Sequence, residues 1–138
     1  GKVDTKSALT AVDLFPTFLE LAGVSLPKNY QSDGESIVAA LKGETFQRRK
    51  AIIAQWPSGG RNYNWPQTMI IDGPWKLLYS KYKQHQPQLY RWSDDHKEVH
   101  NLAAQNPSVV ETLKAKANEI ISTFPKSPQG KVFSKERQ

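Results

Sequence analysis

Two histidines four residues apart, His96 and His100, lie among three acidic side chains near the end of the chain. On a helix this spacing would place both imidazoles on one face, as in zinc sites. The stretch has the pattern of a turn instead, because the apolar strand expected at 88–92 stops at short polar side chains that favour tight turns. No third histidine completes a metalloprotease pattern. We therefore predict that Asp95, Glu98 and Asn101 stabilise a turn, and we assign no metal ligand.

The other residue types predict no catalytic centre. The 138 residues include no cysteine, which excludes disulfides, thiolate metal sites and a cysteine nucleophile within this chain. The acids fall at expected turns and on exposed helix faces, so no argument brings two carboxylates together across a cleft, as glycoside hydrolysis needs. A P-loop, a dinucleotide-binding glycine pattern and a nucleophile elbow are absent.

The segment 59–66 is the strongest candidate for binding. It combines a glycine pair with one cation, two amides and two aromatic side chains. An arginine can bind a sulfate or carboxylate through two hydrogen bonds, and aromatic rings stack on sugars or aryl groups. The alternative is a long hairpin loop whose aromatics cover the sheet edge. His85 lies in the next expected hairpin, where a lone histidine is usually solvated. Trp56, Trp75 and Trp92 are expected in the core.

The formal net charge of +6 has two interpretations. One is solubility, and the other is attraction to a polyanion such as an acidic glycan, a nucleic acid or a membrane surface. The basic residues are scattered, and the local group Arg48–Lys50 does not resemble a nucleic-acid arm. No apolar run approaches the ~20 residues of a membrane span.

The hydrophobic pattern predicts an α+β fold. A helix is expected over residues 8–22, with Asp13 as N-cap, so that Pro16 falls in the first turn, or with a kink at Pro16 if it starts near Ser7. Gly23 is placed to end it. A short helix with Ile37, Val38 and Leu41 follows. Four strands with short connections are expected at 51–54, 68–71, 75–79 and 88–92, which favours an antiparallel meander.

A last helix is expected to begin at Pro107 with Asn106 as its N-cap. Its apolar residues recur at three- and four-residue intervals: Val110, Leu113, Ala117, Ile120 and Phe124. This stripe needs an apolar partner, and one face of the four-stranded sheet provides it. Residues 125–138 are polar and are expected to form a loose tail.

Several phrases of the sequence resemble sulfatases. Residues 12–23 are similar to the sulfatase segment Val-Asp-Leu-x-Pro-Thr-Leu-Leu-Glu-Leu-Ala-Gly. Residues 33–36, 41–43 and 72–78 resemble the family's Asp-Gly-x-Ser, Leu-x-Gly and Gly-x-Trp-Lys-Leu. Residues 89–103 resemble a phrase near the sulfatase C-terminus, with Arg91, Trp92 and His96 departing from it. The five blocks come in family order.

The resemblance implies a piece of a larger enzyme that hydrolyses sulfate esters with a formylglycine and a calcium ion. Both would lie upstream, because Ser25-Leu26-Pro27-Lys28-Asn29 has Asn29 where the family's Ser-x-Pro-x-Arg motif requires arginine. It further implies that residues 1–45 close the large α/β domain, that 46–124 form the small C-terminal domain, and that 125–138 are a tail. The partner would be the N-terminal catalytic domain of the same protein, and the segment alone would be no enzyme.

By loop location, the resemblance makes five residues the expected contacts to a sulfated small molecule or glycan: Arg61, Tyr63, Asn64, Trp65 and His85. It is compatible with a periplasmic or secreted location. Two alternatives stay open: a free-standing basic module that binds glycans or nucleic acid, and a fragment that forms homo-oligomers through an exposed face with Leu14, Phe18 and Leu21.

Overall fold

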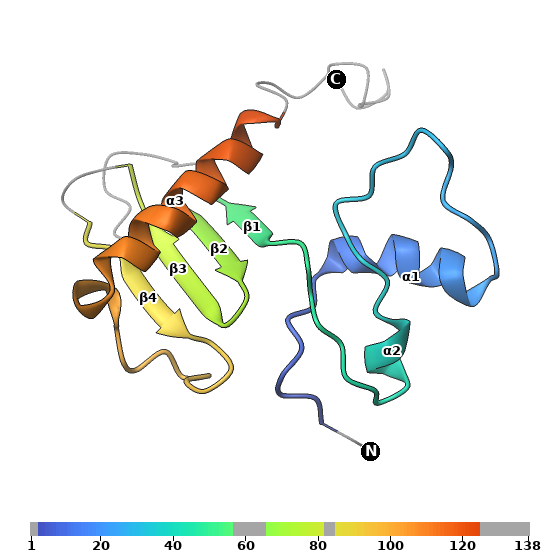
Figure 1. Ribbon diagram of the computed structural model, residues 1–138, viewed down its shortest axis with the longest axis horizontal. Helices are drawn as coiled ribbons and strands as arrows, with labels where there is room; N and C mark the ends of the chain where they lie inside the picture. Colours follow the sequence, from blue (N-terminus) through green and yellow to red (C-terminus); the bar gives the residue numbers. More distant parts are fainter. Residues whose placement is uncertain (1–2, 57–65, 82–84, 125–138) are drawn as a thin grey trace, which may run out of the picture.

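The chain folds into a helical part and a sheet part that lie side by side (Figure 1). The computed structural model describes residues 3–56, 66–81 and 85–124. In the helical part, a short 3-10 helix at Ala11–Asp13 leads into α1 (Leu14–Leu21), and α2 (Val38–Leu41) follows. Residues 42–51 connect this part to the sheet part.

The sheet part is a four-stranded antiparallel meander with the strand order β1-β2-β3-β4. Its elements are β1 (Ile52–Gln55), β2 (Thr68–Asp72), β3 (Trp75–Tyr79), β4 (Gln88–Arg91), a 3-10 helix (Ala103–Gln105) and α3 (Pro107–Ser122). The predicted α+β fold is confirmed. β4 ends one residue earlier than expected, because the amides of Asp94 and Asp95 both donate to the carbonyl of Arg91 and start a turn there.

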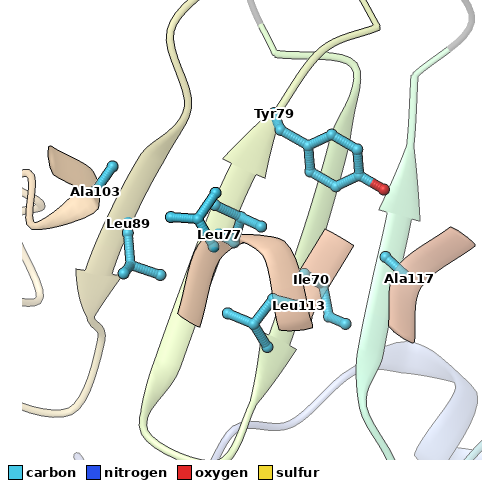
Figure 2. Close-up of a cluster of buried hydrophobic side chains, with 8 residues drawn as sticks. Ile70, Leu77, Tyr79, Leu89, Ala103, Leu113 and Ala117 are labelled. Carbon is cyan, nitrogen blue, oxygen red and sulfur yellow. The ribbon is translucent and has the colours of Figure 1, made fainter. Parts of the chain in front are cut away.

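The sheet is held to α3 by an apolar core. The strand register places Ile53, Ile70, Leu77 and Leu89 in one row across the sheet. Figure 2 shows Leu113 and Ala117 of α3 beside Ile70 and Leu77 of this row. The side chains of Ile70, Leu77, Leu89 and Ala117 have no exposed surface. The apolar stripe of α3 thus packs on one face of the sheet, as predicted.

The predicted stripe of α3 is buried only in its first half. Val110, Leu113 and Ala117 are buried, whereas Ile120 is half-buried and Phe124 is 41% exposed. The end of α3 reaches beyond the sheet in Figure 1. The predicted start is confirmed, with Asn106 as N-cap and Pro107 as the first helical residue. Residues 125–138, the expected tail, lie outside the described residues.

α1 begins where the N-cap alternative predicted. Asp13 is its N-cap and Leu14 its first residue, so Pro16 lies in the first turn, where its missing N–H removes no helical hydrogen bond. Gly23 follows with a φ of 67°, a left-handed conformation that glycine adopts without strain. The predicted helix over 8–22 is therefore shorter at its start, where residues 11–13 form the 3-10 helix instead.

The polarity of α1 is inverted relative to an ordinary surface helix. The polar side chains of Asp13 and Thr17 have no exposed surface, whereas Leu14, Phe18 and Leu21 are 46%, 61% and 58% exposed. The Thr17 hydroxyl donates to the Asp13 carbonyl and accepts the amide of Ile37 at 3.0 Å.

No helix among the described residues is long and apolar enough to cross a membrane.

We expect the packing of α3 on the sheet to dominate the stability of the sheet part. Leu113→Ala should lower the free energy of unfolding by about 2–5 kcal/mol, because it removes buried methyl groups and leaves a cavity. Urea denaturation followed by circular dichroism would measure the change. Glu119→Ala on the exposed side of the same helix should change it by less than about 0.5 kcal/mol. Equal effects of the two substitutions would contradict this packing.

Candidate functional site

The turn after β4 is built by carboxylate and amide side chains, as predicted. The Asp95 carboxylate accepts the amides of Val99 at 3.1 Å and His100 at 2.8 Å. Asn101 Oδ1 accepts the amides of Leu89 and Ala103, both at 3.0 Å. These bonds join the turn to β4 and to the 3-10 helix at Ala103–Gln105.

Glu98 completes this turn by pairing with Lys76 of β3. It adopts a φ of 54°, which is uncommon outside glycine. His100 lies 3.6 Å from Asp95 through Nδ1, and His96 is exposed. Among the described residues, no three histidine, aspartate or glutamate side chains are arranged to hold a metal ion. Within this stretch, Asp95 therefore binds backbone amides and Glu98 pairs with a side chain of the neighbouring strand.

Four of the five predicted substrate contacts lie outside the described residues: Arg61, Tyr63, Asn64 and Trp65. The fifth, His85, is half-buried just before β4. The strands that flank both loops end side by side, because Gln55 pairs with Thr68 and Thr68 pairs with Tyr79. The β1–β2 and β3–β4 connections therefore leave the sheet at the same end. We call this end the loop edge.

Trp56 marks the loop edge and corrects a sequence-based expectation. It was expected in the core, but 53% of its surface is exposed. It follows the last residue of β1, and its amide donates to the carbonyl of Gln67 at 2.9 Å. The backbone is thus held in the sheet while the indole remains accessible. Trp75, by contrast, packs against the core, and Trp92 is half-buried with its indole N–H on the Gly73 carbonyl.

A buried ion pair joins the helical part to the connecting segment. Arg48 binds Asp13 through two parallel hydrogen bonds, Nη1 to Oδ2 at 2.7 Å and Nη2 to Oδ1 at 2.8 Å. The Asp13 side chain has no exposed surface and that of Arg48 is 8% exposed. The carboxylate also accepts the amides of Thr10 at 2.8 Å and Glu35 at 3.0 Å.

A second carboxylate, that of Glu35, binds the next two residues of the same segment. Its Oε2 accepts the amides of Arg49 and Lys50, both at 2.9 Å, and its Oε1 accepts Arg49 Nε at 3.1 Å. Lys50 Nζ donates to the Ser32 carbonyl. We call the five charged residues the carboxylate clamp: Asp13, Glu35, Arg48, Arg49 and Lys50. Of the basic triplet, the Arg48 side chain is buried, whereas that of Arg49 is 89% exposed.

Gly34 allows the backbone before Glu35 to lie against the backbone of Val12 and Asp13. A Cβ atom at this position would lie 2.1 Å from the carbonyl oxygen of Val12, closer than any side chain can be accommodated without moving the backbone. Glycine is therefore required in the Asp33-Gly34-Glu35 phrase by close backbone contact. Nothing local in the sequence indicates that this phrase lies against Val12.

A cleft of about 1310 Å³ lies between the helical part and the end of α3. Val12, Pro16 and Leu19 line it from the helical part, and Lys116 and Ile120 from α3. Residues 48–53 contribute to its wall as well. The two parts are thus connected through the clamp and its segment, with a cleft between α1 and α3.

Sequence comparison identifies the family. The model of the C-terminal region of N-sulphoglucosamine sulphohydrolase matches residues 1–123. The chain belongs to this sulfatase family. Mouse arylsulfatase K is 31% identical over 134 residues, which cover 91% of this chain and 23% of that protein. A sulfatase of Formosa agariphila is 32% identical over 116 residues, 78% of this chain and 21% of that protein.

Solved structures agree with this family. Ps i-CgsB shares 27% identity and a TM-score of 0.59 over 78% of this chain and 23% of its own. A protein from a Bacteroides thetaiotaomicron locus for the metabolism of multiple glycosaminoglycans shares 26% identity and a TM-score of 0.56, over 78% of this chain and 24% of its own. This sulfatase C-terminal region therefore spans about a quarter of the relatives it matches.

The clamp of this sulfatase region keeps two buried carboxylates ionised. Burial opposes ionisation of Asp13, but the hydrogen bonds from Arg48 and from the amides of Glu35 and Thr10 outweigh it and lower the pKa of Asp13. Burial likewise opposes ionisation of Glu35, and the amides of Lys50 and Arg49 outweigh it and lower the pKa of that carboxyl. Breaking such a buried pair costs about 3–5 kcal/mol, because one charge stays buried without a partner.

We expect the clamp to make stability depend on acid pH. Because both folded pKa values lie below the unfolded ones, the stabilisation is present above the unfolded pKa near ~4 and is lost as pH falls through the folded values. Urea denaturation between about pH 7 and pH 3 should show this loss. Glu35→Gln should be less stable at neutral pH and should lose less on acidification, whereas the exposed Glu111→Gln should follow the unsubstituted chain. If the free energy of unfolding fell equally with decreasing pH in all three proteins, Glu35 would not be a source of the acid sensitivity.

Proposed function

We propose that this chain is the C-terminal portion of a sulfatase that hydrolyses sulfate esters, and that it supplies structural support and substrate-selecting loops. The observation that carries the proposal is the family match over residues 1–123, in a chain that spans about a quarter of its relatives. The reacting groups would then belong to the preceding part of the same protein.

The calcium ion and formylglycine implied by the sulfatase resemblance do not fit the residues of this chain. The sequence has no cysteine to become formylglycine, and Asn29 interrupts the serine version of that motif. The described residues contain no cluster of three acidic or histidine side chains that could hold the ion. We therefore place both groups in the upstream part and derive no catalytic step here.

The exposed face of α1 supports the proposed division into domains. We propose that residues 1–45 complete the large domain, that 46–124 form the small domain, and that 125–138 are a tail. Three apolar side chains on the outer face of α1 are left about half exposed by the described residues: Leu14, Phe18 and Leu21. A helix with polar residues inside and apolar residues outside is stable where another surface covers it. The preceding part of the same protein is the proposed cover.

The loop edge supports the proposed role in substrate selection. The two connections that carry Arg61, Tyr63, Asn64, Trp65 and His85 start from the same end of the sheet, and the exposed Trp56 lies there as well. Arginine and aromatic side chains suit a sulfated sugar. Among the relatives, Ps i-CgsB has been solved in complex with k-i-k-neocarrahexaose. We therefore propose a sulfated glycan or a smaller sulfate ester as the substrate.

The alternative of a free-standing module for nucleic acid has less support than the sequence suggested. In the compact basic triplet 48–50, Arg48 is buried against Asp13. Lys50 donates to backbone carbonyls of the helical part. The buried Arg48 offers little charge to a phosphate backbone, whereas the side chain of Arg49 is 89% exposed.

The division of chemistry between the two parts is directly testable. The full-length parent protein should hydrolyse 4-nitrocatechol sulfate, whereas the purified 138-residue chain should not, because it has no residue for the displacement. Release of the coloured catechol measures both. Turnover by the isolated chain would refute the placement of the chemistry upstream, and a parent without any sulfate-ester hydrolysis would refute the proposed function.

The proposed docking of α1 predicts opposite results for one substitution in two contexts. Phe18→Asp should leave the unfolding free energy of the isolated chain within about 0.5 kcal/mol, since Phe18 is 61% exposed there. In the full-length parent it should cost about 2–4 kcal/mol, because a charge enters a buried interface. Thermal denaturation of both proteins measures this difference. Equal stability of the parent and its variant would mean that another surface, such as a second copy of the chain, covers α1.

A further inference from the structure

We infer that the carboxylate clamp is a positioning device for substrate selection: it fixes the direction in which the loop edge points relative to α1. The inference rests on the proposed function and adds a role to residues far from the loops. Arg48 and Glu35 would act through the sheet and would have no contact with substrate. The argument follows from where the clamp sits along the chain.

The clamp is placed between the two parts whose relative orientation matters. Asp13 is the N-cap of α1, and Glu35 precedes α2 by three residues. The basic residues 48–50 end two residues before β1 begins at Ile52. Every clamp contact between side chains therefore joins the helical part to the entrance of the sheet.

Little else among the described elements fixes this orientation. α1 contacts α2, and α3 contacts β2 and β3, whereas a cleft of about 1310 Å³ separates α1 from the end of α3. A chain segment alone can rotate about its backbone dihedrals. The clamp prevents this rotation, because it binds three consecutive residues of the segment from two sides.

Arg48 holds the segment in one geometry rather than merely near it. Besides the two bonds to Asp13, its Nε donates to the Lys50 carbonyl at 2.9 Å and its Nη1 to the Ala8 carbonyl at 3.3 Å. A planar guanidinium with partners on several sides fixes direction, which a lysine ammonium cannot do. Glu35 adds the amides of Arg49 and Lys50, so the backbone leading into β1 is fixed as well.

The distance between the clamp and the loop edge amplifies small rotations. Trp56 is six residues beyond Lys50, or about 20 Å along an extended chain. A rotation of roughly 10° at the clamp would therefore move the loop edge by about 3 to 4 Å, taking that extended length as the lever. A misplacement of about 1 Å can already cost as much as ~100-fold in a positioned reaction. A sulfated oligosaccharide that spans the active site and the loop edge would sense this shift, whereas a small aryl sulfate would not.

The experiment compares two substrates of the full-length parent enzyme. Arg48→Lys keeps the charge and loses the two-pronged geometry, so it should raise KM for a sulfated oligosaccharide by about 3- to 10-fold. The kcat for 4-nitrocatechol sulfate should change by less than about two-fold. Arg61→Gln should likewise raise KM for the oligosaccharide and leave kcat for 4-nitrocatechol sulfate nearly unchanged. Lys76→Gln breaks an ion pair within the sheet part and should leave both substrates unaffected.

Glu35→Gln provides a second, milder variant if Arg48→Lys does not fold. It should raise KM for the oligosaccharide and leave turnover of the aryl sulfate nearly unchanged. It should also speed hydrogen exchange at the amides of Arg49 and Lys50, which donate hydrogen bonds to the Glu35 carboxylate. The sulfated probes are oligosaccharides of chondroitin sulfate, heparan sulfate and carrageenan.

Three results would overturn the inference: equal losses on both substrates, no change in either, or hydrolysis of the aryl sulfate alone by the unsubstituted enzyme. Hydrolysis of neither substrate would instead refute the proposed function.

Discussion

The Asp13 carboxylate has no exposed surface, and a charge in that position is stable only when protein groups replace water around it. Here the Arg48 guanidinium and two backbone amides replace it. The consequence extends well beyond one residue. To provide these partners, the chain must bring residues 10, 35 and 48 to one point, which sets the path of the helical part and the start of β1. Much of the arrangement in the helical part follows from this requirement.

The same requirement explains the inverted polarity of α1. Because its polar N-cap and Thr17 face the clamp and the backbone before α2, the apolar residues must face elsewhere. Two of its sides are therefore apolar, one toward the cleft and one toward solvent. In an independent domain both would be costly to leave uncovered. In a chain that spans about a quarter of its relatives, they fit a segment that completes a larger core.

The sheet part has the opposite character and contains its own core. α3 covers one face of the meander, and the turn after β4 is fixed by its own carboxylate and amide side chains. The strand ends that form the loop edge thus belong to a unit with its own core. This agrees with its proposed role of presenting side chains to a substrate. The clamp connects the sheet part, which has its own core, to the helical part.

The sequence by itself determined the elements and the family. The apolar recurrence at three and four residues in α3 and the Asn106-Pro107 start are local signals, and local signals act over a few residues. The five phrases that resemble sulfatases needed no structure either. Only the tertiary structure showed that Arg48 binds Asp13, that Gly34 touches Val12 and that Trp56 is exposed. These contacts join residues 22 to 35 positions apart, or depend on where a sheet ends, and no short-range pattern encodes them.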